Sequence, residues 1–282
     1  MESEVSSSDH NVRLVSISSA TTSLWTELND IWDYRELLYF LTLRDIRIRY
    51  NNTFIGILWV VLKPLSAVIV FTFLFSKVAR IESQELPYPI FAFAGIAPWF
   101  FFSNTVSNCS NSLISNSNLI TKVYFPRLII PAAALVAGLV DFCITLVFMF
   151  SLMLYYDLRL SYTLVLLPFL VIVTSLLTLS AGILTSALTV KYRDVQHILP
   201  FLLQLMMFAT PVLYPPSLIP PALGNLVYVN PWAGIIEGYR AVISGRLPDI
   251  ISITISLLVT LIITFFSTWY FRRTEHSFAD II

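Results

Sequence analysis

The chain has 282 residues, of which 57% are hydrophobic and only 12% are charged. A soluble domain carries about 25% charged residues, so this composition excludes an ordinary soluble protein and indicates an integral membrane protein. The 17 basic and 17 acidic residues give a net charge of zero, which argues against a nucleic-acid partner.

The N-terminal region is predicted to stay on one side of the membrane. Residues 1–23 are rich in serine and lack the basic and apolar regions of a signal peptide, which predicts a disordered cytoplasmic tail. Residues 24–54 mix apolar side chains with a basic cluster, which predicts helices along the cytoplasmic interface. The cluster, Arg44, Arg47 and Arg49, either anchors the chain to lipid phosphates or binds the anionic head of a substrate.

Six stretches are apolar and long enough to cross a bilayer, which takes about 20 residues of helix. They predict an all-α integral membrane protein with a six-span domain over residues 55–273, followed by a cytoplasmic C-terminus at 274–282. The fifth stretch is the shortest, and several prolines follow it. The predicted spans cover residues 55–77, 88–112, 128–155, 162–190, 197–214 and 249–271.

Basic residues predict the orientation of these spans, because cytoplasmic loops carry more lysine and arginine. With the N-terminus in the cytoplasm, most of the 17 basic residues fall on or near the cytoplasmic side. The opposite arrangement reverses this bias. We therefore expect both termini in the cytoplasm, in agreement with an even number of spans.

The second predicted span changes character along its length. Its first half is apolar and aromatic, whereas residues 103–118 are mostly serine, asparagine and threonine and carry no charge. Such a neutral face suits a water-filled vestibule or close contact with another helix. Helical spacing places Asn104, Asn108 and Asn111 on one stripe, and Ser103, Ser107 and Ser110 on the next.

Asp141 lies deep within the third predicted span, where a carboxylate is costly and suggests a functional role by default. A structural hydrogen bond to a neighbouring helix is the alternative. One acidic residue is weak support for a proton relay, because a proton-coupled carrier would more comfortably show several such groups.

Residues 211–248 are too apolar for an exposed loop and too rich in proline and glycine for one continuous helix. Irregular backbone at membrane depth is tolerated only where protein covers it or where it faces water. We therefore expect a re-entrant hairpin of short helices on the external side, between spans five and six. Within one short helix of this hairpin, Glu237 and Arg240 are three residues apart and can pair.

No catalytic or nucleotide-binding pattern is visible in the sequence. The chain contains no Gly-Lys pair, which a phosphate-binding P-loop requires. The three histidines lie far apart, and no group of His, Cys, Asp and Glu residues has metal-ligand spacing. We expect this chain to contribute no catalytic residue, no metal site and no bound cofactor.

Five segments occur in an order that carries a family resemblance, although each alone would be a weak signal. They are LRDIRIRYNNTFIGILWVVLKPL (43–65), NLITKVYFPRLIIP (118–131), LTVKYRDVQHILP (188–200), MMFATPVLYPPSLIP (206–220) and VNPWAGIIEGYRAVISG (229–245). From about residue 32 to 273, the chain resembles the membrane subunits of ATP-binding-cassette exporters that move O-antigen, capsule and teichoic-acid polysaccharides.

The resemblance implies a permease that leaves ATP hydrolysis to a separate partner. Two copies of the permease would pair with two copies of an ATPase subunit, which binds ATP and Mg²⁺, and the channel would form between the two permeases. The implied substrate is a glycan linked to an undecaprenyl carrier. It would enter from the cytoplasmic side of the bacterial inner membrane, where the permease also contacts membrane lipid.

The resemblance also assigns the residues that dock on the ATPase. The stretch 113–127 corresponds to the main docking element, in which Phe125 and Pro126 predict a rigid apolar knob between two charged residues. The turn after the fourth span corresponds to a minor contact. An ordinary positive-inside loop and a simple helix cap remain the alternatives for these two segments. The implied docking residues are Lys122, Tyr124, Phe125, Pro126 and Arg127, with Lys191, Arg193 and Asp194 in the second turn.

Three further sites follow for such a transporter. The arginines at 44, 47 and 49 correspond to a cytoplasmic gate region that faces the carrier pyrophosphate. A path for uncharged sugars needs aromatic faces and neutral hydrogen-bonding groups with contacts weak enough to release, although aromatic residues also form membrane-surface belts. The expected channel lining is Trp99, Phe100, Phe101, Phe102, Asn104, Asn108 and Asn111, and the expected external gate is Tyr214, Pro215, Asn230, Pro231, Glu237 and Arg240.

Two other functions compete with polysaccharide export. A permease for a drug or a simple lipid would keep the six spans, but would not be expected to match the docking loop and the hairpin so fully. An integral-membrane enzyme or scaffold of glycan synthesis is the other alternative. The enzyme would show acids or histidines clustered at one membrane face, and the sequence contains no such cluster.

Overall fold

The computed structural model describes residues 32–51, 56, 58–78, 86–216, 229–276 and 278. Helices joined by short connections make up this part of the chain, and no strand occurs in it, as predicted for an all-α protein. Several predictions lie outside the described residues: the tail at 1–23, the start of the interface segment, the tip of the external hairpin at 217–228, and the last residues of the C-terminus.

Five helices in the described part are long and apolar enough to cross a membrane, which supports the prediction of a multi-pass membrane protein. They correspond to the first, second, third, fourth and sixth predicted spans. They are α3 (Leu58–Phe71) with its π-helical continuation η1 (Thr72–Val78), α4 (Tyr88–Ser115), α6 (Ile129–Tyr155), α7 (Leu167–Lys191) with the preceding 3-10 turn η2 (Tyr162–Leu166), and α11 (Ile250–Glu275).

The fifth predicted span is shorter than expected. Helix α8 covers Val195–Ala209, and 15 residues of helix extend about 22 Å, less than the roughly 30 Å of a hydrocarbon core. The prediction of a helix up to residue 214 was wrong because the chain leaves helical geometry at Thr210, next to Pro211. The chain then reaches a further short helix, α10 (Pro231–Ser244).

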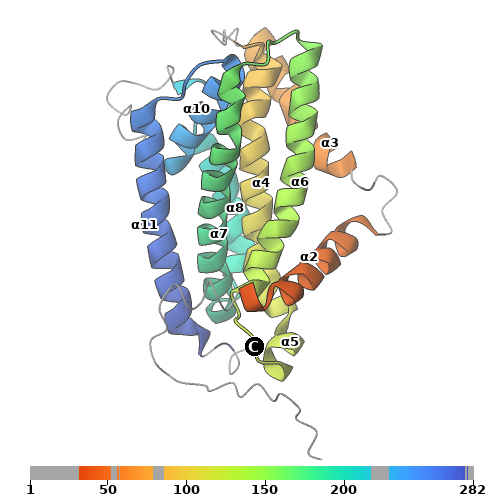
Figure 1. Cartoon of the computed structure of the whole chain (residues 1–282), viewed down its shortest axis with the longest axis vertical. Helices are drawn as coiled ribbons and strands as arrows, with labels where there is room; N and C mark the ends of the chain where they lie inside the picture. The colour runs from red at the N-terminus through yellow and green to blue at the C-terminus, as the bar shows by residue number, and fades with distance from the viewer. Residues whose placement is uncertain are drawn as a thin grey trace, which may run out of the picture.

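Helix α4 occupies the centre of the bundle. It packs between α6 and α7, with α11 on the far side of α7 and α3 against α4 and α6 (Figure 1). A Cβ atom on Gly138 of α6 would lie 2.2 Å from the Oγ1 of Thr105 on α4. The Thr105 side chain therefore packs directly on the α6 backbone, which requires glycine at 138, and small residues of this kind are common at helix contacts in membranes.

The two ends of the bundle carry different elements. Helix α2 (Arg35–Tyr50), the short α5 (Ser117–Lys122) and the end of α11 lie at one end, and α10 lies at the opposite end (Figure 1). The loops predicted to be cytoplasmic therefore share one end, and the described part of the predicted external hairpin, which includes α10, lies at the other.

Helix α2 is not flat across its end of the bundle. It runs obliquely against α6, so that its C-terminal end lies farther along α6 than its start (Figure 1). Near that end Arg49 reaches Asp141, which is about 18 Å along the α6 axis from Ile129. The basic end of α2 thus reaches deeper along the bundle than a helix lying flat at the interface.

Candidate functional site

A cavity of about 520 Å³ lies between the end of α2, α3, α4 and α6. It brings one of the predicted gate arginines together with four of the predicted channel residues. The aromatic walls are Trp59, Phe100 and Phe101, and the polar and charged walls include Arg49, Tyr50, Lys63, Asn104, Asn108 and Asp141. We call this space the α2–α6 cavity.

Asp141 joins α2 to α6 at the wall of the cavity. Its Oδ2 lies 2.6 Å from Nη1 of Arg49, and its Oδ1 accepts a hydrogen bond from the hydroxyl of Tyr50. The Arg49 and Asp141 side chains are 25% and 24% exposed. A carboxylate and a guanidinium at membrane depth are each costly alone, so their pairing explains how both are accommodated.

Tyr50 remains a hydrogen-bond donor in this arrangement. Burial raises the pKa of its hydroxyl above the ordinary value of 10.0, and the hydrogen bond to Asp141 and the charge of that carboxylate raise it further. The phenol is therefore neutral at physiological pH. The Asp141 carboxylate accordingly has two donors from α2, one charged and one neutral.

The walls of the cavity carry one positive charge in excess. Arg49 and Lys63 are the basic residues of the lining, and Asp141 is the acidic one. Within the described part of the chain, the ammonium of Lys63 has no ion-pair partner. The remaining polar lining is neutral, so the electrostatic field in the cavity favours an anion next to sugar-like neutral groups.

The polar residues of α4 divide between two roles that the sequence left open. Asn104, Asn108 and Asn111 are exposed along the middle and C-terminal part of α4. Ser110, in contrast, is fully buried and hydrogen-bonded to Thr189 of α7 at 2.6 Å. The asparagine stripe thus faces outward from this single chain, whereas this part of the serine stripe packs against another helix.

The aromatic half of α4 is mostly core. Trp99 and Phe102 are 1% and 5% exposed, and their ring centroids lie 5.3 and 4.7 Å from Trp232 of α10. Their prediction as channel lining was wrong for this chain because α10 folds over them. Phe100 and Phe101 do line the α2–α6 cavity, and Phe101 stacks on Phe142 of α6 at 4.7 Å.

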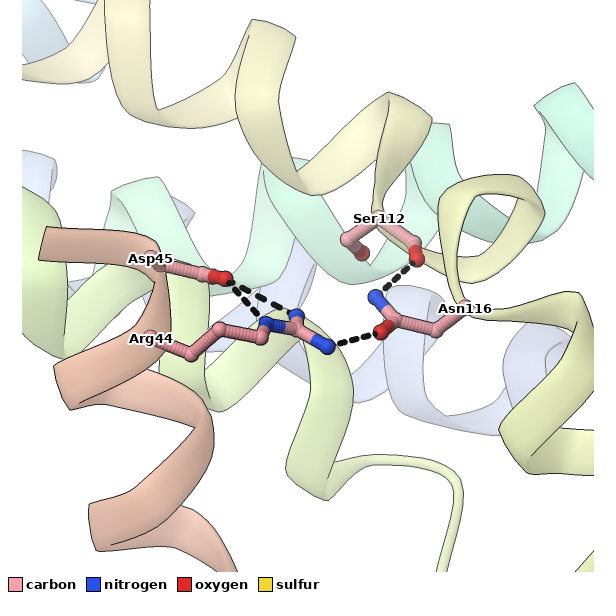
Figure 2. Close-up of polar contacts among 4 residues, drawn as sticks. All are labelled: Arg44, Asp45, Ser112 and Asn116. Carbon is pink, nitrogen blue, oxygen red and sulfur yellow. Dashed lines mark hydrogen bonds and ion pairs between the residues drawn. The ribbon is translucent and has the colours of Figure 1, made fainter. Parts of the chain in front are cut away.

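The three predicted gate arginines, all on α2, have separate environments. Arg44 bonds to the adjacent Asp45 and donates from Nη1 to Oδ1 of Asn116 at 2.7 Å, and the Asn116 amide donates to the carbonyl of Ser112 (Figure 2). Asn116 is the residue between α4 and α5. Arg47 is exposed. Of the predicted gate arginines, only the one at position 49 lines the cavity.

The exposed tip of the predicted docking loop is formed by Val123 and Tyr124, not by Phe125 and Pro126 as expected. Phe125 is 5% exposed and packs in a core with Leu41 of α2 and Phe271 of α11, so the prediction of an exposed Phe-Pro knob was wrong. Val123 and Tyr124 are 52% and 70% exposed instead. The loop with its neighbours also borders a small pocket of about 230 Å³.

Arg127, the last residue of the main predicted docking segment, is hydrogen-bonded to the C-terminal end of α11. Its guanidinium donates to the carbonyl of Glu275, and its backbone N–H donates to Oε1 of Glu275 at 3.3 Å. Lys122 is exposed, as are Lys191, Arg193 and Asp194 in the turn between α7 and α8. Both predicted docking segments thus present charge at the same end of the bundle (Figure 1).

At the opposite end, the residues of the predicted external gate hold an irregular segment in place. Asn230 caps α10 by accepting from the N–H of Trp232 at 3.1 Å, and its amide donates to Oγ1 of Thr210 at 2.8 Å. Pro231 starts α10, where its missing N–H costs nothing. Tyr214 donates to the carbonyl of Phe208 at 3.2 Å, and Pro215 follows directly.

Arg240 of α10 is the buried cation that covers this irregular segment. It is 2% exposed, donates from Nη2 to the carbonyl of Val212 at 2.7 Å, and lies 3.7 Å from the centroid of the Phe91 ring. Glu237 is its ion-pair partner at 3.7 Å.

Sequence reasoning assigned neither Tyr50 nor Lys63 to a site, although both line the cavity, and it did not identify the partner of Asp141. Arg49 and Asp141 are 92 positions apart, and no spacing rule relates them. The sequence does contain one signal for these residues. Asp141, Lys63 and the arginine cluster are charged residues within or next to apolar predicted spans, near the predicted cytoplasmic side. This signal does not say which of them meet.

Known proteins match this chain over most of its length. The family described as ABC-2 type transporter matches residues 36–244. The O-antigen export system permease protein RfbA of Myxococcus xanthus is 32% identical over 90% of this chain and 98% of that protein. An RfbA of the same description from Klebsiella pneumoniae is 27% identical over 88% and 95%, and the polysialic acid transport protein KpsM of Escherichia coli is 24% identical over 84% and 93%. The chain therefore belongs to the ABC-2 type transporter family, as a membrane transport subunit and not an enzyme.

Proposed function

We propose that this chain is the permease subunit of an ATP-driven exporter that moves a lipid-linked polysaccharide out of the cytoplasm. The relatives named for O-antigen export and polysialic acid transport support the class of cargo. The observation that carries the proposal in this chain is the lining of the α2–α6 cavity. It combines an excess positive charge with neutral amides and aromatic rings.

Each part of that lining suits one part of such a substrate. Arg49 and Lys63 attract the diphosphate that joins a glycan to an undecaprenyl carrier, because basic side chains bind phosphate strongly. Asn104 and Asn108 offer neutral hydrogen bonds to sugar hydroxyls. Trp59 and Phe100 offer flat apolar faces, along which a sugar chain can slide without being held, whereas the Phe101 ring is covered by Phe142.

The assembly that we propose contains two copies of this chain. Amide side chains exposed along the middle of a spanning helix are costly against lipid, so they face water or protein. The exposed stripe of Asn104, Asn108 and Asn111 therefore lines a channel between the two copies. Helix α8, together with residues 210–216 and α10, completes a sixth passage whose outer part is the re-entrant external gate. Both termini lie in the cytoplasm, and the membrane is the bacterial inner membrane.

A separate ABC ATPase drives transport, as membership of the ABC-2 type transporter family implies. We propose two copies of this partner, which bind ATP and Mg²⁺. They dock on Lys122, Val123 and Tyr124 at the tip of the loop, with a minor contact at the turn 191–194. The buried Phe125 and the tie from Arg127 to Glu275 hold this tip rigid rather than touching the partner.

Deletion of the gene is expected to remove the exported glycan from the cell surface and to accumulate carrier-linked glycan inside. The measurement is glycan staining of surface fractions together with mass spectrometry of the undecaprenyl-linked pool. Complementation with the intact chain is the control. Persistent surface glycan without internal accumulation would contradict polysaccharide export and favour a drug or simple-lipid permease.

Replacing Tyr124 with alanine is expected to reduce co-purification of the ATPase several-fold without loss of folded permease. An exposed aromatic ring at a protein contact contributes more binding energy than most side chains, and removal of Tyr124 leaves the core intact. The matched control is Tyr155→Ala, because Tyr155 is 79% exposed at the opposite end of the bundle. Equal co-purification of the two variants would remove Tyr124 from the docking surface.

A further inference from the structure

The contact between Asp141 and α2 has a consequence for how the cavity admits an anion. Arg49 is one of two cations in the cavity wall, and the Asp141 carboxylate already occupies it at 2.6 Å. A guanidinium presents a planar fork that a carboxylate and a phosphate bind in the same way. The two anions therefore compete for one side chain.

We propose that Asp141 is a built-in counter-ion that holds Arg49, and with it the end of α2, until a phosphate head group takes its place. This inference rests on the proposed function and adds a regulatory residue to the same site. It makes Asp141 a positioning residue and a selectivity element. It does not assign Asp141 to a proton relay.

Because of this competition, only a strongly charged anion displaces Asp141 from Arg49. A neutral lipid has nothing to exchange for the carboxylate, so Arg49 stays paired with Asp141. A diphosphate carries more charge than one carboxylate and meets Lys63 as well, which has no ion-pair partner in the described part of the chain. Two cations for one head group favour the exchange.

Tyr50 makes the exchange reversible. Its hydroxyl donates to the other oxygen of Asp141, so the carboxylate keeps one donor when Arg49 turns to the phosphate. A buried carboxylate that lost both donors would be strongly destabilised. The phenol therefore stabilises the state in which the head group is bound, and it leaves α2 close enough to bind Asp141 again after release.

Arg44 connects the same helix to the docking element. Its bond to Asn116 places the earlier part of α2 against the residue that joins α4 to α5 (Figure 2). Exchange at Arg49 changes the restraint on α2 at one end, and this second contact carries that change to the start of the docking segment. The cavity and the docking loop are thus linked through one helix.

The test uses the full permease with its ATPase in nanodiscs of phosphatidylcholine, with undecaprenyl diphosphate as the probe. Asp141→Asn is expected to bind the probe at least about tenfold more tightly than the wild type, because the competing charge is gone. The matched control is Asp45→Asn, since Asp45 pairs with Arg44 and does not line the cavity, and its affinity should be unchanged.

Hydrogen exchange over peptides covering α2 supplies the second readout. The probe is expected to raise exchange near Arg49 in the wild type, and Asp141→Asn is expected to show raised exchange without the probe. Three further compounds act as comparison ligands. Undecaprenol tests the neutral lipid chain, inorganic pyrophosphate tests the free anion, and phosphatidylglycerol tests an ordinary anionic lipid. Neutral undecaprenol should leave exchange unchanged.

The outcomes separate this inference from the function on which it rests. If Asp141→Asn binds undecaprenyl diphosphate equally or more weakly, Asp141 only supports the fold of the site, and the counter-ion proposal is overturned. If the wild type binds undecaprenyl diphosphate no better than undecaprenol, the head-group site itself is wrong. Tighter binding by Asp141→Asn, with the Asp45→Asn control unchanged, supports both.

Discussion

Replacing Arg240 with methionine is expected to lower the free energy of unfolding by about 2 to 4 kcal/mol, enough to reduce the yield of folded protein. The guanidinium donates to the buried carbonyl of Val212 and lies on the ring of Phe91, and methionine supplies neither contact. The carbonyl would then remain buried without a donor. Thermal unfolding in detergent, followed by size-exclusion chromatography, measures the effect.

Two variants make this prediction specific. Arg159→Met changes an exposed arginine at the same end of the bundle and should leave stability unchanged. Gly95→Ala leaves Arg240 in place but puts a Cβ atom 2.5 Å from the carbonyl of Val212, so it should destabilise the same segment. If Arg240→Met unfolds at the temperature of Arg159→Met, the irregular segment does not depend on this side chain.

Joint replacement of Arg49 and Lys63 by glutamine is expected to reduce export at least about tenfold, while the complex still assembles. Each side chain offers a charge-assisted hydrogen bond to the carrier diphosphate, and the loss of one such bond costs about 1.5 to 3 kcal/mol. The measurement is the initial rate at which surface glycan reappears after induction of the variant in a deletion strain.

The control for this experiment is Arg47→Gln. Arg47 belongs to the same basic cluster but is exposed and does not line the cavity. If Arg47→Gln exports glycan at a near-normal rate while the Arg49 and Lys63 double variant does not, the loss of export is due to the cavity. Equal losses in both would mean that the cluster acts as a general anchor to anionic lipid, as the sequence alone allowed.

The sequence was sufficient for features that depend on local composition. Long apolar stretches predicted the five helices that are long and apolar enough to cross a membrane, within a few residues of their observed ends, because hydrophobic length is a local property. The order of five short motifs was sufficient to predict the family. The asparagine stripe on α4 followed from helical spacing, and the structure leaves Asn104, Asn108 and Asn111 exposed together.

Features that depend on contacts between distant segments were decided only by the tertiary structure. Phe125 and Trp99 are apolar in sequence whether they face a partner, a channel or the core, and only packing against α11 and α10 places them in the core. The three clustered arginines near the end of α2 look equivalent in sequence, yet Arg44 contacts Asn116, Arg47 is exposed and Arg49 contacts Asp141. The sequence by itself determined which charges enter the membrane region. Because a charge at that depth needs a counter-charge whose position depends on the packing of α2 against α6, only the fold decided which of them pair.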